Sequence, residues 1–419
     1  MLRNLLNDAG GWNAIRRAVY ALALRSLPGI YALGTLLTLI RYLPLAEYGQ
    51  YGIAIAYVNL SAMCSWGLWS VSLVRALPGT EREGVIGPVI WMMTGTAIIA
   101  STLSLIILPA LQVSQEAALW VAGIVLVFIP RLLSYALAQA DANNRAALWI
   151  DASYYFGALS GFVILAYSDR LSSVENVMRM IFFAAAVSAA ISLLLYGKMF
   201  RPRLHGRWRF VRQYGTWTGM QSLGDIYMQQ GDIILIGTML DPVRLAPYIA
   251  ARALIRLYTM LSQAVNFLLL PVASRLAAEG EYVRLRKKVR SALLSVWAIL
   301  IPLNILLFMI ADEVIPAVLG VKYLASVPYF KIVIGATFFE PVQSVLANAL
   351  IGIGKARKVA ILAWTVLGMN IAANIVLVTA FQMDAVPWIL VATYAAMSIG
   401  FVLLSHKDLS ADNHQKRTQ

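Results

Sequence analysis

The sequence predicts an all-α integral membrane protein with twelve transmembrane helices, arranged as two six-helix lobes that are related by an internal parallel repeat around a central cavity. Three observations support this fold class. Hydrophobic residues make up 60% of the 419-residue chain and charged residues 13%, about half of the roughly 25% charged content of an average soluble domain. Apolar windows of about twenty residues, enough to cross a hydrocarbon core about 30 Å thick, recur along the whole chain. The two halves of the chain also resemble each other.

The apolar windows give the predicted transmembrane helices in order. They cover residues 18–43, 49–77, 88–111, 117–140, 148–167, 177–198, 215–239, 248–276, 289–311, 327–351, 359–381 and 387–405. Trp91, Trp120, Trp149 and Trp388 lie within the first residues of four windows, and such rings settle at the headgroup level of a bilayer. The first twenty residues lack the short apolar core and cleavage site of a signal peptide, so we expect a retained interfacial segment.

The distribution of Lys and Arg predicts the orientation of the helices. With a cytoplasmic N-terminus, the outer loops contain only Arg170, Arg244 and Lys322, and the remaining loop cations lie on the inner side. Short loops on the cytoplasmic side carry such an excess of positive charge. We therefore expect a multi-pass membrane protein with both termini in the cytoplasm. The net charge of +14 then reflects topology, and the basic run 198–212 is expected to contact anionic lipid headgroups rather than nucleic acid.

An internal repeat divides the chain into two lobes. The segment "LPLAEYGQYGIA" follows the first window, and "LDPVRLAPYIAA" occupies the equivalent place in the second half, with Leu43, Tyr51 and Ala54 matching Leu240, Tyr248 and Ala251. An even number of helices per unit keeps both copies in the same orientation, and transporters built this way place their substrate site between the halves. The predicted parts are an N-terminal lobe at 1–197, a basic cytoplasmic linker at 198–214, a C-terminal lobe at 215–405 and a cytoplasmic tail at 406–419.

The residues that are missing from the predicted membrane region exclude several kinds of chemistry. His205, His406 and His414 all lie in the inner loop or the tail, and Cys64 is the only cysteine, so we expect no histidine catalysis, disulfide or thiolate metal site there. The sequence has no nucleotide-binding P-loop and no soluble segment long enough for a catalytic domain. We therefore predict a protein that is not an enzyme and that uses no cofactor and no metal.

Charges inside the predicted helices are the candidate functional residues. Arg252 and Arg256 lie one helical turn apart in "YIAARALIRLYTML", and each would cost about 2.5–3.5 kcal/mol if it faced lipid. They must face protein or water. Arg25 lies about seven residues into the first window, just before Pro28 and Gly29, where a kink can open the helix towards a cavity. Substrate contact and a purely structural ion pair are both open for these three arginines.

The intramembrane carboxylates supply possible partners and candidate ion-coupling groups, namely Asp225, Asp232 and Glu340. Counted from the outer turn near residue 243, Asp232 lies at a depth within one helical turn of Arg252 and Arg256. Asp225 and Asp232 are seven residues apart and share a helix face with Gln229, a further candidate for substrate contact. One carboxylate neutralises only one arginine, so the predicted cavity keeps a surplus of positive charge that suits an anionic substrate.

Three segments resemble a known family. They are "RYLPLAEYGQYGIAIAYVNLSAM", the long stretch from "GDIILIGTMLDPVRLAPYIAARALIRLY" to "LLLPVASRLAAEGEYVRLRKKV", and "LGVKYLASVPYFKIVIGATFFEPVQSVLANALIGIGKARKVA". Their helix-boundary motifs are similar to those of polysaccharide transporters of the multidrug/oligosaccharidyl-lipid/polysaccharide flippase superfamily. The resemblance covers nearly the whole chain and is weaker over 88–200.

The resemblance implies a Wzx-type flippase of the bacterial inner membrane, which moves undecaprenyl-pyrophosphate-linked oligosaccharides from the cytoplasmic to the periplasmic leaflet. It implies that Arg25 and either Arg252 or Arg256 grip the pyrophosphate, since planar guanidinium groups bind phosphate bidentately. Membrane lipids, a polysaccharide polymerase and chain-length machinery are the implied partners. A cation-coupled multidrug exporter and a non-transporting assembly scaffold are the alternatives. The first window contains Arg25 and no acidic residue, which counts against the exporter.

Overall fold

The structure of the chain is a computed structural model. It describes residues 12–70, 72–73, 80–141, 143–200, 206–255, 273, 276–277 and 279–408. Within these helices, the side chains at 12–19, 21–22, 25, 80–82, 213–218, 221–222, 225 and 407–408 lie outside the description. Of the predicted site residues, Arg256 therefore lies outside the described residues, and Arg25 and Asp225 are placed by their backbone only.

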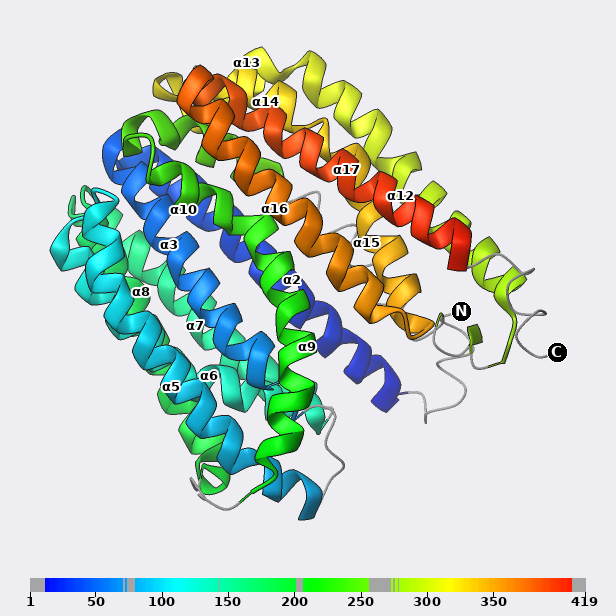
Figure 1. Ribbon diagram of the computed structural model, residues 1–419. Helices are drawn as coiled ribbons and strands as arrows, with labels where there is room; N and C mark the ends of the chain where they lie inside the picture. Colours follow the sequence, from blue (N-terminus) through cyan, green and yellow to red (C-terminus); the bar gives the residue numbers. More distant parts are fainter. Residues whose placement is uncertain are drawn as a thin grey trace. The chain divides into compact units, whose positions relative to one another are not determined.

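Contacts within the chain define two compact units, residues 1–226 and 227–419. The first unit contains α2 (Trp12–Tyr42), α3 (Leu45–Ser65), the π-helical η1 (Trp66–Ser70), α5 (Thr80–Ala110), α6 (Gln115–Ala140), α7 (Asn144–Tyr167), α8 (Val174–Tyr196), η2 (Gly197–Met199) and α9 (Trp208–Ile226). α6 packs against α5 and α8, α7 packs against α8 and α2 (Figure 1), and α9 packs on η1 and α3.

Small residues and hydroxyl groups hold the first unit together. A Cβ added to Gly157 of α7 would lie 3.3 Å from the Cβ of Ala184 of α8, so the two helix backbones approach closely. The Ser188 hydroxyl of α8 donates to the carbonyl of Ile150 at 2.7 Å. In a bilayer, where lipid is as apolar as leucine, such close packing and interhelical hydrogen bonds drive helix association. Large apolar side chains such as Leu194, which is 86% exposed, point away from this packing.

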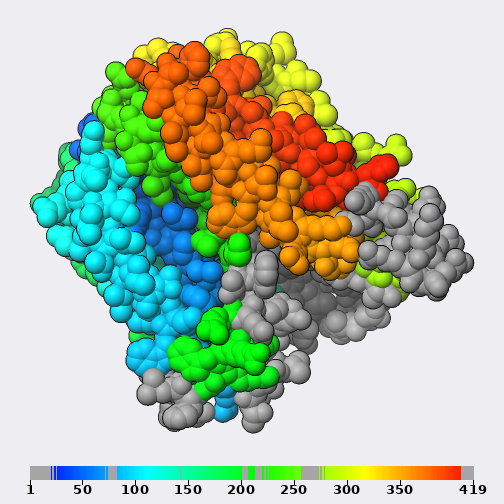
Figure 2. All heavy atoms as spheres, in the orientation of Figure 1, coloured from blue at the N-terminus to red at the C-terminus, as the bar shows by residue number. Residues whose placement is uncertain are grey.

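The second unit contains η3 (Tyr227–Gly231), α10 (Asp232–Gly237), the helical residues 242–255, α12 (Tyr282–Met309), α13 (Ala311–Leu319), η4 (Val321–Tyr323), α14 (Ser326–Val333), α15 (Ala336–Gly352), α16 (Ala356–Phe381), η5 (Gln382–Asp384) and α17 (Ala385–Asp408). α17 packs along α15 and α16, and α12 packs on α15. Figure 2 shows α16 and α17 side by side on one face of this unit. Their shared core is apolar and includes Met228, Val345, Ala349, Ala363 and Phe401.

The described residues confirm a multi-span helical membrane protein. Seven helical stretches in them are long and apolar enough to cross a membrane, or eight if α14 and α15, which meet at a bend of 40°, form one broken span. Each predicted window contains residues that are helical in the structure, and the count of twelve spans stays a prediction. The short helix α13 was not predicted, because its nine residues are too few to cross a bilayer.

The two units are not delimited at the predicted linker. The division falls between Ile226 and Tyr227, beyond the predicted linker at 198–214, because α9 packs on helices of the first unit. Part of this linker region is nevertheless fixed locally, since the Arg207 N–H donates to the carbonyl of Gly84 at 2.8 Å. The two units are defined by contacts within the chain, whereas the two lobes were predicted from a repeat in the sequence. The predicted limits of the lobes therefore stay a prediction.

Candidate functional site

The candidate site begins at a π-helical interruption in the helix that contains Asp232. α9 ends at Ile226, η3 occupies Tyr227–Gly231, and α10 continues the helix from Asp232. A Cβ added to Gly231 would overlap the Tyr227 ring, so this wide turn requires glycine at that position. π-Helical turns of this kind release backbone groups from their usual partners and often occur at functional sites.

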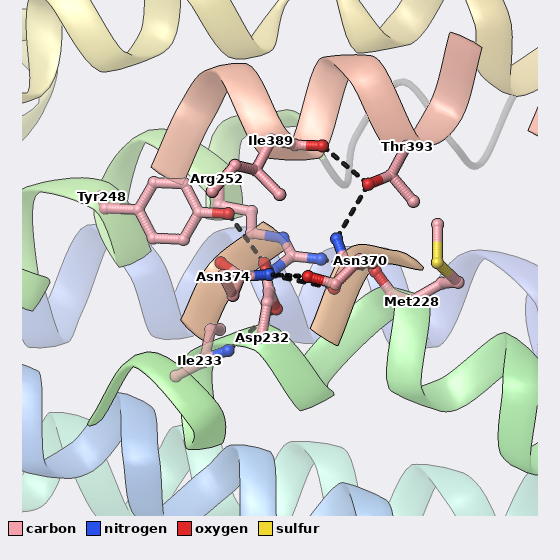
Figure 3. A network of polar contacts seen from close by, with 9 residues as sticks. All are labelled: Met228, Asp232, Ile233, Tyr248, Arg252, Asn370, Asn374, Ile389 and Thr393. Atoms are coloured by element: carbon pink, nitrogen blue, oxygen red, sulfur yellow. Dashed lines mark hydrogen bonds and ion pairs between the residues drawn. The ribbon is translucent and has the colours of Figure 1, made fainter. Parts of the chain in front are cut away.

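A buried ion pair lies directly beside the interruption. Asp232 and Arg252 are 5% and 6% exposed, and the Arg252 Nη1 contacts Asp232 Oδ2 (Figure 3). The Arg252 Nη2 also donates to the carbonyl of Met228, inside the π-helical turn, at 2.6 Å. The pairing of Asp232 with one of the two arginines, which their predicted depth indicated, is therefore present for Arg252.

The carboxylate of Asp232 has a protein partner on each oxygen. Its Oδ1 accepts a hydrogen bond from the N–H of Ile233 at 2.8 Å, and its Oδ2 accepts one from the Tyr248 hydroxyl at 2.8 Å. Tyr248 is fully buried and belongs to the repeated motif of the second half. A buried charge is tolerated only when it is paired and hydrogen-bonded. Asp232 and Arg252 therefore neutralise each other within the described part of the chain.

Polar side chains of α16 and α17 lie next to this ion pair (Figure 3). Asn374 donates to the side-chain oxygen of Asn370 at 3.0 Å, Asn370 donates to the Thr393 hydroxyl at 2.8 Å, and Thr393 donates to the carbonyl of Ile389 at 2.6 Å. All three polar side chains are buried. α10 packs against α16, so the carboxylate, the guanidinium and the amides form one polar region within the second unit.

Two other predicted site residues have described side chains. Gln229 is in η3 with an exposed side chain, and Glu340 is in α15 with a half-buried one. Arg25 lies on α2 and Asp225 on α9, both without described side chains. Their roles in binding cargo or coupling ions stay predictions. Among the described residues, no group of three His, Cys, Asp or Glu side chains is placed to hold a metal ion.

The first unit contains a second buried ion pair, which sequence reasoning missed. The Arg131 Nη2 of α6 contacts the Asp151 Oδ1 of α7 at 2.6 Å, with 9% and 8% of the two side chains exposed. The guanidinium also stacks over Tyr154, with its Cζ 4.4 Å from the ring centroid, and lies near Phe128 at 5.2 Å. Both residues lie inside predicted transmembrane windows. Counting residues from the turn between α6 and α7 would have placed them at similar depth and so predicted the pair.

The fold is similar to that of several solved membrane transporters. Solved structures that are similar to this chain include "Lipid II flippase MurJ, inward closed conformation", with a TM-score of 0.73 and 14% identity over 94% of this chain and 88% of that one. The inward-facing conformation of a multidrug resistance MATE family transporter of the MOP superfamily has a TM-score of 0.71 and 12% identity over 93% and 98%. An outward-facing conformation of such a transporter has a TM-score of 0.63 and 14% identity over 95% of each chain.

These likenesses define the fold class: a multi-pass helical membrane protein with a fold similar to that of solved transporters of the MOP superfamily. Residues 38–328 match the family model described as "Polysaccharide biosynthesis protein", more than half of the chain, and the chain belongs to that family. This confirms the family resemblance of the sequence motifs. No curated protein matches the chain.

Proposed function

We propose that this protein is a flippase that moves undecaprenyl-pyrophosphate-linked oligosaccharides from the cytoplasmic to the periplasmic leaflet of the bacterial inner membrane. The observation that carries the proposal is the combination of the polysaccharide biosynthesis family with the MOP transporter fold. Building an exported polysaccharide on a lipid carrier requires that the carrier's polar head cross the bilayer. A transporter of this family is suited to that step.

The proposed architecture has twelve transmembrane helices in two six-helix lobes, with both termini in the cytoplasm and a central cavity between the lobes. Alternating access then exposes the cavity to one leaflet at a time. Asp225 and Glu340 are the proposed ion-coupling carboxylates. Asp232 is a weaker candidate than the sequence alone indicated, because both of its oxygens already have protein partners.

The ion pair changes which arginines are proposed to meet the pyrophosphate. Arg252 shares its charge with Asp232 and donates a further hydrogen bond to a backbone carbonyl, so its guanidinium is already occupied. Arg25 and Arg256 are therefore proposed to supply the positive charge for the cargo, with Gln229, whose side chain is exposed, as a neutral hydrogen-bonding contact. Arginine suits this task because its planar fork matches two phosphate oxygens at once.

The test is a leaflet-resolved assay for lipid-linked oligosaccharide in cells that lack the gene and in cells that express it again. We expect the oligosaccharide to accumulate on the cytoplasmic leaflet without the protein and to be cleared by the wild type. Arg256→Gln at matched protein level should leave the oligosaccharide on the cytoplasmic leaflet, whereas a scaffold would tolerate that substitution. Normal clearance without the protein, together with lost export of cationic drugs, would identify an exporter instead.

A further inference from the structure

One exposed face of α12 forms a groove whose described lining residues all lie on that helix. The groove has a volume of about 440 Å³ and is lined by Lys287, Arg290, Ser291, Leu294, Ser295 and Ala298. These positions recur at intervals of three and four residues, so they share one face of the helix. All six side chains are exposed, and only 17% of the apolar window of α12 is buried inside the protein.

The cations of this groove are available to a ligand. Among the residues that the structure describes, no carboxylate pairs with Lys287 or Arg290. Arg284, by contrast, donates to both carboxylate oxygens of Glu281 at 2.9 Å. The positive charge at this end of α12 therefore favours an anion and repels a group that carries its own ammonium charge.

The chemistry of the groove changes in one direction along the helix. Lys287 and Arg290 lie at one end, the Ser291 hydroxyl follows, and Leu294 and Ala298 line the other end. The Ser295 hydroxyl donates to the carbonyl of Ser291 at 2.8 Å, which keeps this polar group turned towards its own helix. At about 1.5 Å per residue, the lined face is roughly 16 Å long, comparable with half of a hydrocarbon core about 30 Å thick.

We propose that this face of α12 binds an anionic phospholipid of the surrounding bilayer. The headgroup phosphate lies between Lys287 and Arg290, the Ser291 hydroxyl donates to the phosphate or glycerol ester oxygens, and an acyl chain runs along Leu294 and Ala298. The order of charge, hydroxyl and apolar surface on the helix is the order of phosphate, ester and hydrocarbon in a phospholipid. The two cations make the site selective for lipids with a net negative charge.

The experiment measures contact between lipid and groove in the full-length protein. In a Cys64→Ser background, Ala298→Cys is labelled with a small fluorophore, and the protein is placed in bilayer discs of phosphatidylcholine with a fixed fraction of brominated lipid. Brominated phosphatidylglycerol should quench the label more strongly than brominated phosphatidylcholine at equal bromine content. A label at Ile299→Cys, which is exposed but outside the groove, should be quenched equally by the two lipids.

A pair of matched double variants tests the cations. Lys287→Gln with Arg290→Gln should weaken the preference for brominated phosphatidylglycerol about thirtyfold, since each basic residue near an anionic headgroup contributes about fivefold. Arg284→Gln with Lys288→Gln removes the same charge from the same turns of the helix and should leave the preference within about twofold. Thermal unfolding of each variant in detergent checks that the fold is intact.

Three outcomes would overturn the proposal. The first is equal quenching of the Ala298→Cys label by the two brominated lipids. The second is a preference that survives the loss of both Lys287 and Arg290. The third is displacement of the brominated lipid by purified lipid-linked oligosaccharide but not by phosphatidylglycerol, which would assign the groove to the transport path. The proposed flippase function does not depend on any of these results.

Discussion

The carboxylate of Glu47 accepts a hydrogen bond from the backbone N–H of Val174 at 2.7 Å, although the two residues are 127 positions apart in the chain. Val174 is the first residue of α8, and the preceding Ser173 makes no side-chain capping bond. Glu47 therefore supplies the acceptor that a local cap normally provides, and its negative charge lies at the positive end of the helix dipole. This gives a structural role to the glutamate of the "LPLAEYG" motif.

Replacing Glu47 with alanine should lower the free energy of unfolding by about 1–2 kcal/mol, the usual effect of losing an N-terminal cap. Glu47→Gln keeps an acceptor oxygen and should lose less. Thermal unfolding of the purified protein in detergent measures both. Glu116→Ala serves as the control, because Glu116 makes an exposed ion pair with Arg179, which contributes about 0–1 kcal/mol. Equal unfolding temperatures for Glu47→Ala and the wild type would contradict the capping role.

Breaking the Asp232–Arg252 pair should destabilise the second unit more than removing the whole pair does. Asp232→Asn and Arg252→Gln each leave one buried charge unpaired, at a cost of about 3–5 kcal/mol, and should reduce the amount of folded protein. The double variant leaves no buried ion and should recover most of that amount and the transport activity. Membrane protein levels and leaflet-resolved transport are the two measurements. A double variant with normal protein level and no transport would instead assign Arg252 to the cargo.

The Arg131–Asp151 pair allows a direct comparison with an exposed pair in the same unit. Asp151→Asn should cost about 3–5 kcal/mol, because it leaves the Arg131 guanidinium buried without a counter-charge. Arg131→Lys keeps the charge but loses the planar stack on Tyr154 and should cost about 1–2 kcal/mol. The corresponding changes in the exposed pair of Arg179 and Glu116 should cost about 0–1 kcal/mol. Unfolding in detergent ranks the variants, and similar losses for both pairs would refute the argument from burial.

Replacing glycine with alanine should have opposite effects on stability at two positions in long helices. A Cβ at Gly219 of α9 would lie 2.8 Å from the backbone Cα of Leu68 in η1, where no side chain can move aside, whereas a Cβ at Gly95 of α5 would have no atom within 4 Å. Gly219→Ala should therefore push α9 off η1 and lower the unfolding temperature. Gly95→Ala should be neutral or stabilising by up to about 1 kcal/mol, since alanine favours helix. Equal effects of the two changes would show that the α9–η1 contact is not close.

The proposed topology can be tested with reporter fusions. Reporters after Asp169 or Asp384 should be active on the periplasmic side, and reporters after Arg207 or Lys288 on the cytoplasmic side, because the basic loops are retained inside. Reporter enzymes that work in only one of the two compartments provide the measurement. A cytoplasmic signal after Asp384 would contradict the twelve-span arrangement with cytoplasmic termini.

Much of the helical framework could be predicted because a transmembrane helix has a length and a composition that can be recognised locally. The pairing of Asp232 with an arginine of the next helix could also be predicted. The two helices are joined by a short turn, so counting residues from that turn gives the depth of each charge. The same count would have paired Arg131 with Asp151, since α6 and α7 are joined by a short turn as well.

The parts of the fold and the site that could not be predicted depend on packing between segments that are distant in sequence. The contact of Glu47 with Val174 joins α3 to α8, and no local pattern specifies that these helices are neighbours. The position of Arg252 beside Asp232 is also fixed by the π-helical turn, which presents the carbonyl of Met228 to its guanidinium. The polar residues of α16 and α17 were visible as interruptions of apolar windows, but their place beside Asp232 follows from tertiary packing.

The π-helical turn at Tyr227–Gly231 sets the angle between the Met228 carbonyl and the Asp232 carboxylate, the two groups that Arg252 contacts. An α-helix rotates by about 100° per residue, so deleting one residue between Met228 and Asp232 would carry one group about 100° around the axis relative to the other. Arg252 could then no longer reach both partners. The extra residue of the turn therefore works as a spacer that directs a backbone oxygen and a carboxylate towards the same guanidinium.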